Sequence, residues 1–362
     1  YMGRAFEAGL GRRVLIDKYF EGREVEVDAV CDGETVLIPG IMEHVERAGV
    51  HSGDSMAIYP GLTLSESEVN AVVDYTTRIG LALDIRGLMN IQYVVVGGPA
   101  YRSPGTASGN NGQKTQVYVI EVNPRSSRTI PFISKVTGVP MVKLATKTML
   151  GQSIKDQGYK GGLFKRQKLV GVKAPVFSMS KLAGVDTYLG PEMKSTGEVM
   201  GIDYEFRPAF AKALMAAGMT LPADGAILLS ISDRDKSEAV QMIRDLATAN
   251  YTFYATGGTA DLIEGLDLDL AVNRISRRLA AHPNVLDVIL DGTVDAVVNT
   301  VTGDREVLQD GFHIRRAAVD VRIPCFTSLD TARAAVESMA GSGVAYNIKP
   351  MNEYLAGPSS KR

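Results

Sequence analysis

The stretch Val117-Tyr-Val-Ile-Glu-Val-Asn-Pro-Arg-Ser-Ser-Arg128 is the most informative part of the chain. Residues Val117 to Val122 predict a β-strand, which the proline after Asn123 ends. Alternate side chains of a strand face the same side, so Glu121 and Asn123 present a carboxylate and an amide oxygen to one point. Hard oxygen donors of this kind suit Mg²⁺, which takes its remaining ligands from water and phosphate.

Two arginines follow this strand end directly. Arg125 and Arg128 carry guanidinium groups whose forked donors match phosphate oxygens. Together with the two oxygen donors they predict a site for a magnesium-complexed nucleotide, in which both arginines serve catalysis by holding phosphate. The alternative is an ordinary strand end with a solvated charge cluster, and the spacing alone leaves both interpretations open.

Longer blocks of the sequence resemble the large chains of carbamoyl-phosphate synthases. The resemblance runs from about residue 14 to about residue 340, with the blocks in the same order as in that family. They are Gly40-Ile-Met-Glu-His-Val-Glu-Arg-Ala-Gly-Val-His-Ser-Gly-Asp-Ser55, Leu88-Met-Asn-Ile-Gln92, Ile120-Glu-Val-Asn-Pro-Arg-Ser-Ser-Arg-Thr-Ile-Pro-Phe-Ile-Ser-Lys-Val-Thr-Gly-Val-Pro140 and Leu189-Gly-Pro-Glu-Met-Lys-Ser-Thr-Gly-Glu-Val-Met-Gly201. The resemblance implies the second of that family's two ATP-grasp units, followed by its regulatory domain.

The fold class expected from the resemblance and the element pattern is α/β. An α+β ATP-grasp lobe is expected over residues 1–150, without the N-terminal lobe that such a domain needs to clamp ATP. A connector is expected over 151–222. A methylglyoxal-synthase-like domain with a doubly wound parallel sheet is expected over 223–362. Because family members are about three times longer, we interpret the chain as a C-terminal part of a longer one.

Local patterns predict the individual elements. Residues 65–83 predict a helix with Ser65 as its N-cap and acidic residues in the first turn. The turn formers of residues 97–116 predict a long hairpin loop, where the family usually has only a few residues. Further strands are predicted at 14–16, 24–30, 35–38, 91–96, 227–231, 252–255 and 295–299, and further helices at 208–218, 236–249, 259–264 and 331–339.

The bulk composition narrows the function classes. The chain has 362 residues, 45% hydrophobic content and a formal net charge of −2, so no basic excess predicts nucleic-acid binding. No apolar run approaches the ~18 residues that cross a bilayer. Cys31 and Cys325 lie far apart and make no metal-binding pattern, which favours a reduced, cytoplasmic location.

The resemblance also implies roles for single residues. Gln92, Glu121 and Asn123 match metal ligands for Mg²⁺ or Mn²⁺. Glu24 matches the carboxylate that binds the nucleotide ribose, although Glu24-Val-Glu-Val-Asp28 also fits a simple two-faced strand. His44 and His51 bracket a polar loop and are expected to contact ATP. The implied reaction is phosphorylation of carbamate by Mg-ATP to carbamoyl phosphate, for pyrimidine and arginine synthesis; we expect this chain alone to bind ATP poorly and to be inactive.

A phosphate cradle is expected in the last domain. In Ala255-Thr-Gly-Gly-Thr-Ala260 a strand runs into a glycine turn and a helix, which presents backbone N–H groups to an anion, although a plain strand-to-helix turn also explains it. The resemblance implies binding of a regulatory nucleotide, UMP or IMP. The implied contacts are Lys236, Thr256, Gly257, Gly258, Thr259, Arg274, Asn299 and Thr300, with Arg274 replacing the family's usual lysine.

A second effector site follows from the family as well. Some relatives hold ornithine with three carboxylates, of which Glu46 and Asp54 match two, with Thr327 beside them. The third position is Ala174 in this chain. Because one carboxylate is missing, we expect activation by a cationic amine to be weak or absent.

The implied partners are a small glutamine-amidotransferase subunit that supplies ammonia and further copies of the chain, with no nucleic acid and no membrane. Two other interpretations were compared. One makes the chain a stand-alone regulatory nucleotide-binding module. The other makes the last domain a lyase that forms methylglyoxal, which the stretch Asn299-Thr-Val-Thr-Gly-Asp-Arg305 disfavours.

Overall fold

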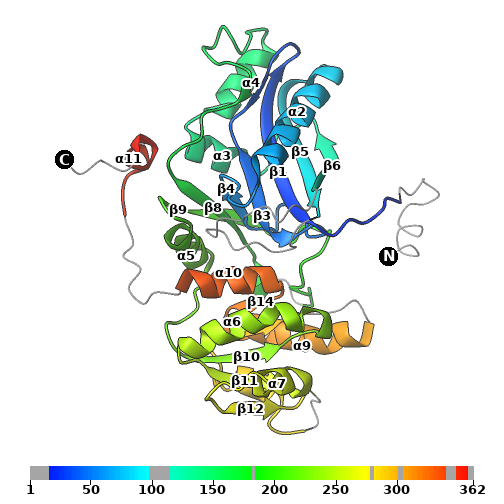
Figure 1. The fold of residues 1–362 in the computed structure, drawn as a ribbon, viewed down its shortest axis with the longest axis vertical. Helices are drawn as coiled ribbons and strands as arrows, with labels where there is room; N and C mark the ends of the chain where they lie inside the picture. The colour runs from blue at the N-terminus through cyan, green and yellow to red at the C-terminus, as the bar shows by residue number, and fades with distance from the viewer. Residues whose placement is uncertain are drawn as a thin grey trace.

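A computed structural model describes residues 16–97, 115–181, 184–277, 281–300, 305–339 and 348–357. Within these residues the chain forms a nine-stranded sheet and a separate five-stranded sheet. The two sheets belong to two domains stacked along the long axis, with α5 (Phe206–Ala217) and α10 (Leu329–Met339) between them (Figure 1). The α/β fold class expected from the sequence is confirmed.

The first sheet has the order β6-β5-β1-β3-β4-β8-β9, and β2 pairs with both β1 and β7. All its pairs are antiparallel except β2 with β7. The strands are β1 Arg23–Asp32, β2 Val36–Ile38, β3 Ile41–Arg47, β4 Ala57–Tyr59, β5 Arg86–Val96, β6 Gln116–Asn123, β7 Gly162–Leu163, β8 Val170–Val176 and β9 Gly197–Asp203.

Helices cover both faces of this sheet, but unevenly. The odd-numbered residues of β1, among them Val25 and Val27, pack in a core with Val72 of α2 (Glu66–Ala82). On the opposite face Val30 packs under α3 (Ile130–Thr137) and α4 (Met141–Met149). The preceding even-numbered residues of β1 carry carboxylates, and this polar part of the face holds the candidate site.

The expected helix at residues 65–83 is confirmed, and its start is fixed by a capping box. Ser65 is the N-cap: its Oγ accepts from the backbone N–H of Glu68 at 3.3 Å, and the Glu68 carboxylate accepts from the Ser65 N–H at 2.7 Å. Both contacts satisfy backbone donors that have no partner inside the helix.

The segment expected to be a connector, residues 151–222, belongs to the first domain. β8 pairs with β4 and β9 pairs with β8, so these strands complete the first sheet, and α5 packs on them. The expectation is therefore corrected. The sequence did not predict these two strands, because neither shows the alternation of a half-buried strand: β8 is buried on both faces, and β9 is mostly half-buried.

The second sheet is entirely parallel, with the order β12-β11-β10-β13-β14. Ile227 and Leu229 of β10 pack with α6, α7 and α10, whereas Leu228 packs with α8 and α9, so helices cover both faces. The elements are β10 Ala226–Ser230, α6 Lys236–Thr248, β11 Thr252–Thr256, α7 Gly257–Glu264, β12 Val272–Ile275, α8 Val285–Leu290, β13 Ala296–Asn299, α9 Arg305–Val321 and β14 Cys325–Phe326.

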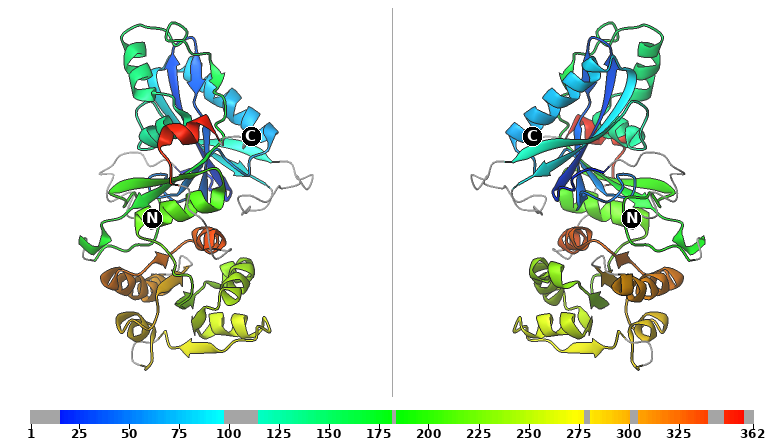
Figure 2. Two further views of the ribbon diagram at one scale, coloured as in Figure 1. Left: turned by 90° about the vertical axis from the view of Figure 1, so that its left-hand side faces the viewer. Right: turned by 90° about the vertical axis from the view of Figure 1, so that its right-hand side faces the viewer.

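The last described helix, α11 (Met351–Ala356), lies with the first domain rather than with the second. The views of Figure 2 show this red helix beside the first domain. Tyr354 packs in the core beside α3, and its hydroxyl accepts from Nζ of Lys212 at 3.0 Å. The assignment of all residues from 223 onward to the last domain is corrected for this helix. The strand expected at 14–16 and the loop expected at 97–116 lie almost wholly outside the described residues.

Contacts between the two domains are both apolar and charged. One apolar cluster runs from Ile58 of the first sheet through Phe210 of α5 to Ile227 of the second sheet. Nε of Arg47, at the end of β3, donates to Asp330 of α10 at 2.9 Å, and its guanidinium also pairs with Glu238 of α6. The two domains therefore bury apolar side chains and an ion pair against each other, and these contacts stabilise their observed arrangement.

Candidate functional site

Three carboxylates lie side by side on the polar face of β1. Glu24, Glu26 and Asp28 are exposed by 2%, 2% and 0%. The strand is two-faced, as the alternative from the sequence stated, but its acidic face is buried like its apolar one. Buried carboxylates are costly unless they are paired or hydrogen-bonded, so their partners decide what this face can do.

His44 of β3 is one such partner. Its Nε2 lies 3.0 Å from Oε2 of Glu26, and its Nδ1 lies 3.3 Å from Oε1 of Glu24. The second contact is an ion pair without the alignment of a hydrogen bond, since Nδ1 has no hydrogen-bond partner among the described residues. One imidazole therefore bridges two acids and holds the Glu24 carboxylate in place.

The charges of this cluster follow from burial and proximity. Burial opposes the charged form of His44, but Glu24 and Glu26 outweigh it and raise its pKa to about 9. Burial also works against the Glu26 carboxylate, yet the hydrogen bond and charge of His44 lower its pKa below the ordinary value. For Asp28, burial and the neighbouring Glu26 charge raise the pKa to about 7. His44 is thus an imidazolium at neutral pH.

Hydroxyl and amide groups complete the cluster. Nδ2 of Asn90 donates to Glu26 at 2.8 Å and to Asp28 at 2.9 Å. Thr129 Oγ1 donates to Asp28 at 2.6 Å, as does Ser127 Oγ at the same distance. The segment after β6, which carries Ser127 and Thr129, therefore folds back over the acids of β1. The sequence did not predict this contact.

The three expected metal ligands meet at the edge of the sheet. Gln92 of β5 and Glu121 of β6 are directly opposite each other in the pairing register, and Nδ2 of Asn123 lies 2.8 Å from Oε1 of Glu121. Nε2 of Gln92 donates to Ser52 Oγ at 2.9 Å, which leaves its oxygen as the atom suited to a cation. One carboxylate and two amide oxygens fit an ion that takes its other ligands from phosphate and water.

A metal cage built from protein alone is absent from the described ranges, because no three His, Cys, Asp or Glu side chains gather there in a suitable way. The set at β5 and β6 has only one carboxylate, so its affinity for an ion without a bound phosphate should be low.

The other expected nucleotide contacts lie near this edge but are held by the protein. A guanidinium N–H of Arg128 donates to Ser195 Oγ at 2.6 Å, whereas the guanidinium of Arg125 is exposed and donates to the carbonyl of Ser126 at 3.1 Å. Nδ1 of His51 accepts from the N–H of Gly53 at 3.0 Å. The loop that carries His51 is anchored by buried Lys173, whose Nζ donates to the carbonyl of Ser52 at 3.0 Å.

The expected phosphate cradle lies where β10, β11 and β13 end. Thr256 ends β11 and is the N-cap of α7, and its hydroxyl lies 3.3 Å from that of Ser230 at the end of β10. A Cβ added at Gly258 would lie 2.8 Å from Nζ of Lys236, while one at Gly257 would meet nothing within 4 Å. The ammonium group, which also pairs with Asp233 at 2.6 Å, therefore lies beside the two glycines that begin α7, where a helix N-terminus favours an anion.

Several residues expected to bind phosphate instead form hydrogen bonds or ion pairs within the domain. Thr259 Oγ1 accepts from the N–H of Ile231 at 3.0 Å, and Thr300 Oγ1 from the N–H of Ser232 at 2.9 Å. Arg274 points to α7 instead, where it pairs with Asp261 at 2.7 Å and with Glu264 at 2.5 Å. Its guanidinium is thus engaged beside the cradle by two carboxylates.

Two arginines that the sequence did not single out lie at the cradle. Arg277 donates to Ser230 Oγ at 3.3 Å. Arg315 of α9, fully buried, donates to Asn299 Oδ1 at 2.8 Å and forms two 2.6 Å contacts with Asp186. No local sequence motif marks either arginine. Arg315 reaches the cradle because α9 packs against the end of β13.

The residues expected to hold a cationic amine line one cavity of about 260 Å³ between the domains. Glu46 and Asp54 form one side of its wall and Thr327 another. Ala174 is fully buried in the shared apolar cluster and supplies no carboxylate.

The charged state of His44 makes stability depend on pH. Its pKa is higher in the folded chain than the ordinary 6.5, so its contribution is complete below about pH 6.5 and is lost as the pH rises through about 9. Denaturant unfolding at a series of pH values should show a loss of up to roughly 3 kcal/mol across this window, beyond that from Asp28. His44→Gln should lack this loss, whereas a control at exposed His282, His282→Gln, should keep it; equal slopes in all three proteins would contradict the assignment.

Two family models match parts of this chain, and a solved structure shows a distant similarity. The family model for the carbamoyl-phosphate synthase L chain, ATP binding domain, matches residues 3–157, and that for the MGS-like domain matches residues 238–327. A biotin carboxylase domain of a thermophilic 2-oxoglutarate carboxylase aligns with a TM-score of 0.41 and 15% identity, over 61% of this chain and 51% of that one.

Full-length relatives match closely but extend much further. The carbamoyl phosphate synthase large chain of Thermomicrobium roseum is 52% identical over 356 residues, which are 98% of this chain and 31% of that one. The large chain of Thermoanaerobacter pseudethanolicus is 48% identical over 355 residues, with the same two shares. The chain thus spans about a third of the length of these relatives, and it belongs to the carbamoyl phosphate synthase large chain family, with an ATP-binding domain and an MGS-like domain.

Proposed function

We propose that the first domain contributes one wall of a Mg-ATP site at which carbamate is phosphorylated to carbamoyl phosphate. The observation that carries this proposal is the pairing of Gln92 with Glu121 across β5 and β6, next to the buried acids of β1. Oxygen donors thereby lie together at an exposed sheet edge, beside a polar face whose acids are buried.

Each residue has a defined part in this proposal. Glu121, Asn123 and Gln92 would hold Mg²⁺ or Mn²⁺, which when bound neutralises charge on the transferred phosphoryl group. Glu24, held by the His44 imidazolium, presents a carboxylate oxygen to the ribose hydroxyls. Arg128, fixed by Ser195, and Arg125 hold phosphate oxygens. Positioning and charge compensation are the main protein contributions to phosphoryl transfer.

The rest of the reaction needs parts beyond this chain. We propose that the complete enzyme is an ATP-dependent ligase acting in the cytoplasm for pyrimidine and arginine synthesis, with a small glutamine-hydrolysing subunit as the ammonia source. Because an ATP-grasp site closes between two lobes, residues 1–362 alone should bind ATP weakly and should not catalyse. No helix among the described residues is long and apolar enough to span a membrane.

The second domain supports a regulatory role. We propose that its cradle binds the phosphate of a nucleoside monophosphate, UMP or IMP, through Lys236, the turn at Gly257 and Gly258, and the end of β13. The ammonium group beside the two glycines that begin α7 favours this function. It also makes the alternative, a stand-alone nucleotide-binding module, the second candidate for the isolated chain. Self-association through this domain is part of the same proposal.

Replacing Glu121 tests the catalytic proposal. In a complete large chain with its small subunit, Glu121→Gln should lower ATP formation from carbamoyl phosphate and Mg-ADP by at least about a hundredfold, because the only carboxylate of the ligand set is lost. Glu34→Gln, at an exposed turn, is the matched control and should leave the rate unchanged. An unchanged rate in the Glu121 variant would remove this strand end from the site.

Titration calorimetry of the 362-residue chain tests the regulatory proposal. UMP or IMP should bind, and Lys236→Ala should weaken binding by at least about tenfold, since a charge-assisted phosphate contact contributes about 1.5–3 kcal/mol. Arg244→Ala changes an exposed cation on the same helix and should have no effect. Equal losses in the two variants would indicate non-specific attraction, and absence of binding by both nucleotides would refute the proposal.

A further inference from the structure

A fully buried arginine lies between the cradle of the second domain and the first domain. Two nitrogens of the Arg315 guanidinium, Nε and one terminal nitrogen, each donate to the Asp186 carboxylate at 2.6 Å. The other terminal nitrogen donates to Oδ1 of Asn299 at 2.8 Å. Asn299 ends β13 at the cradle, whereas Asp186 lies between β8 and β9 of the first domain. The planar fork of one side chain therefore holds a residue of each domain.

The contact with Asn299 decides which way the amide of that residue faces. A guanidinium can only donate hydrogen bonds, so the amide oxygen of Asn299 faces Arg315 and its Nδ2 serves other acceptors. Nδ2 lies 3.5 Å from the carbonyl oxygen of Ser230, which is long for a hydrogen bond. This donor is therefore available at the cradle for a phosphate or ribose oxygen of the proposed effector.

The contact with Asp186 is an ion pair at neutral pH. Burial opposes the Asp186 carboxylate, but hydrogen bonds from Arg315 and from the N–H of Tyr188 lower its pKa below the ordinary value. The guanidinium also lies over the Tyr188 ring, 5.9 Å from its centroid. Residues 184–196, which contain Asp186 and Tyr188, are called the linking segment below.

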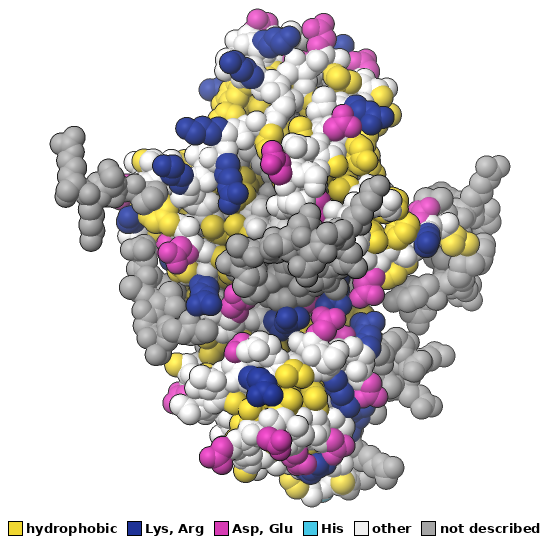
Figure 3. Space-filling model, viewed as in Figure 1, with side chains coloured by type: hydrophobic (Ala, Val, Ile, Leu, Met, Phe, Trp, Pro, Cys, Tyr) yellow, Lys and Arg dark blue, Asp and Glu magenta, His cyan; other side chains and the backbone are white. Residues whose placement is uncertain are grey.

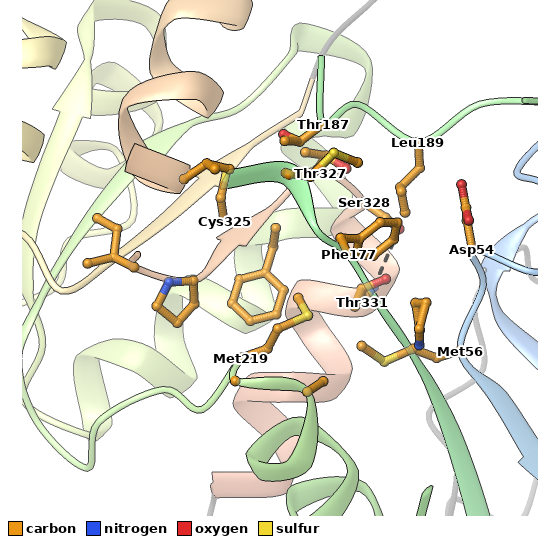
Figure 4. A pocket seen from close by; sticks show the side chains of 18 of the residues that line it. Asp54, Met56, Phe177, Thr187, Leu189, Met219, Cys325, Thr327, Ser328 and Thr331 are labelled. Carbon is orange, nitrogen blue, oxygen red and sulfur yellow. Dashed lines mark hydrogen bonds between the residues drawn. The ribbon is translucent and has the colours of Figure 1, made fainter. Parts of the chain in front are cut away.

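The linking segment continues to two residues of the proposed nucleotide site. The carbonyl oxygen of Gly190 accepts from the backbone N–H of His51 at 2.8 Å. The hydroxyl of Ser195 accepts from the guanidinium of Arg128 at 2.6 Å. Leu189, just before Gly190, lines the interdomain cavity (Figure 4). The partners of His51 and Arg128 therefore lie on the same segment that Arg315 holds.

We propose that Arg315 is a positioning residue that connects the effector cradle with the nucleotide site. Through Asn299 it directs an amide donor to the effector, and through Asp186 it holds the linking segment on which Arg128 is fixed. This inference rests on the proposed binding of a nucleotide effector at the cradle. An effector that binds Nδ2 of Asn299 stabilises one position of Arg315 and hence one position of the linking segment. The coupling is reciprocal, so the state of the linking segment also sets the affinity for the effector.

Arg315→Lys tests the contact with Asn299, because it keeps the positive charge but loses the fork that reaches both domains. In titration calorimetry of the 362-residue chain it should weaken binding of UMP or IMP by at least about fivefold. In an Asn299→Ala background the same change should have no further effect, since Arg315 acts through Asn299. A merely structural role of Arg315 would weaken binding in both backgrounds.

Arg316→Lys is the matched control. It changes the neighbouring arginine of α9, which donates to Asp320 at 2.7 Å and to the carbonyl of Met179 at 3.0 Å. Because this side chain is held by other partners, the variant should bind the effector as tightly as the unchanged chain.

Amide NMR of the same chain tests whether the coupling reaches the linking segment. Saturating effector should shift the backbone amide signals of Tyr188 and Ser195 in the unchanged chain and in Arg316→Lys. In saturated Arg315→Lys only cradle signals, such as that of Gly258, should shift. Absence of UMP and IMP binding by the unchanged chain would refute the effector function and this inference with it. Binding without shifts at Tyr188 and Ser195, the same shifts in Arg315→Lys, or additive losses in the double variant would overturn this inference alone.

Discussion

The row of buried carboxylates on β1 is the constraint on which the first domain depends. Three acids on one face of a central strand would repel one another and destabilise the fold if they stood alone. The chain compensates with a protonated imidazole from β3, an amide from β5 and two hydroxyls from the segment after β6. Three separate segments must therefore be in register with β1 before this face is stable. The same requirement brings Gln92, Glu121 and Asn123 to one edge of the sheet.

Buried charge also joins the two domains. Arg315 contacts Asn299 at the cradle and also forms an ion pair with Asp186. The segment that contains Asp186 continues to Ser195, which accepts a hydrogen bond from Arg128 of the first domain. Arg47 and Glu46, neighbours on β3, reach α10 through Asp330 and Thr331. Breaking one partner of such a contact leaves an uncompensated buried group, which is more costly than the contact is stabilising. The face of the molecule seen in Figure 3, by contrast, intersperses both signs of charge where it is coloured.

The elements that depend on interactions between neighbouring residues were predicted from the sequence. The N-cap at Ser65, the glycine that ends α5 and the alternation of strands and helices after residue 226 all depend on near neighbours, and each is present. The strands β8 and β9 were missed, because β8 pairs with β4, more than a hundred residues earlier, and β9 pairs in turn with β8. For the same reason motifs revealed Glu121 and Lys236 but not Arg315 or Thr129, which reach their sites through tertiary packing. Arg274 was expected to contact the effector, but in the structure it pairs with Asp261 and Glu264 of α7. The sequence pattern gave no sign of these two ion pairs.

The central claim is that His44 is a cation held between Glu24 and Glu26. Its most direct test is imidazole ¹⁵N NMR of the chain, with the His44 signals assigned by comparison with a His44 variant. We predict that both ring nitrogens of His44 carry protons at neutral pH and that the ring titrates with a midpoint near pH 9. A neutral His44 that shows a single protonated nitrogen at pH 7 would contradict the account. It would mean that the acids of β1 are kept buried by protonation of the carboxylates themselves.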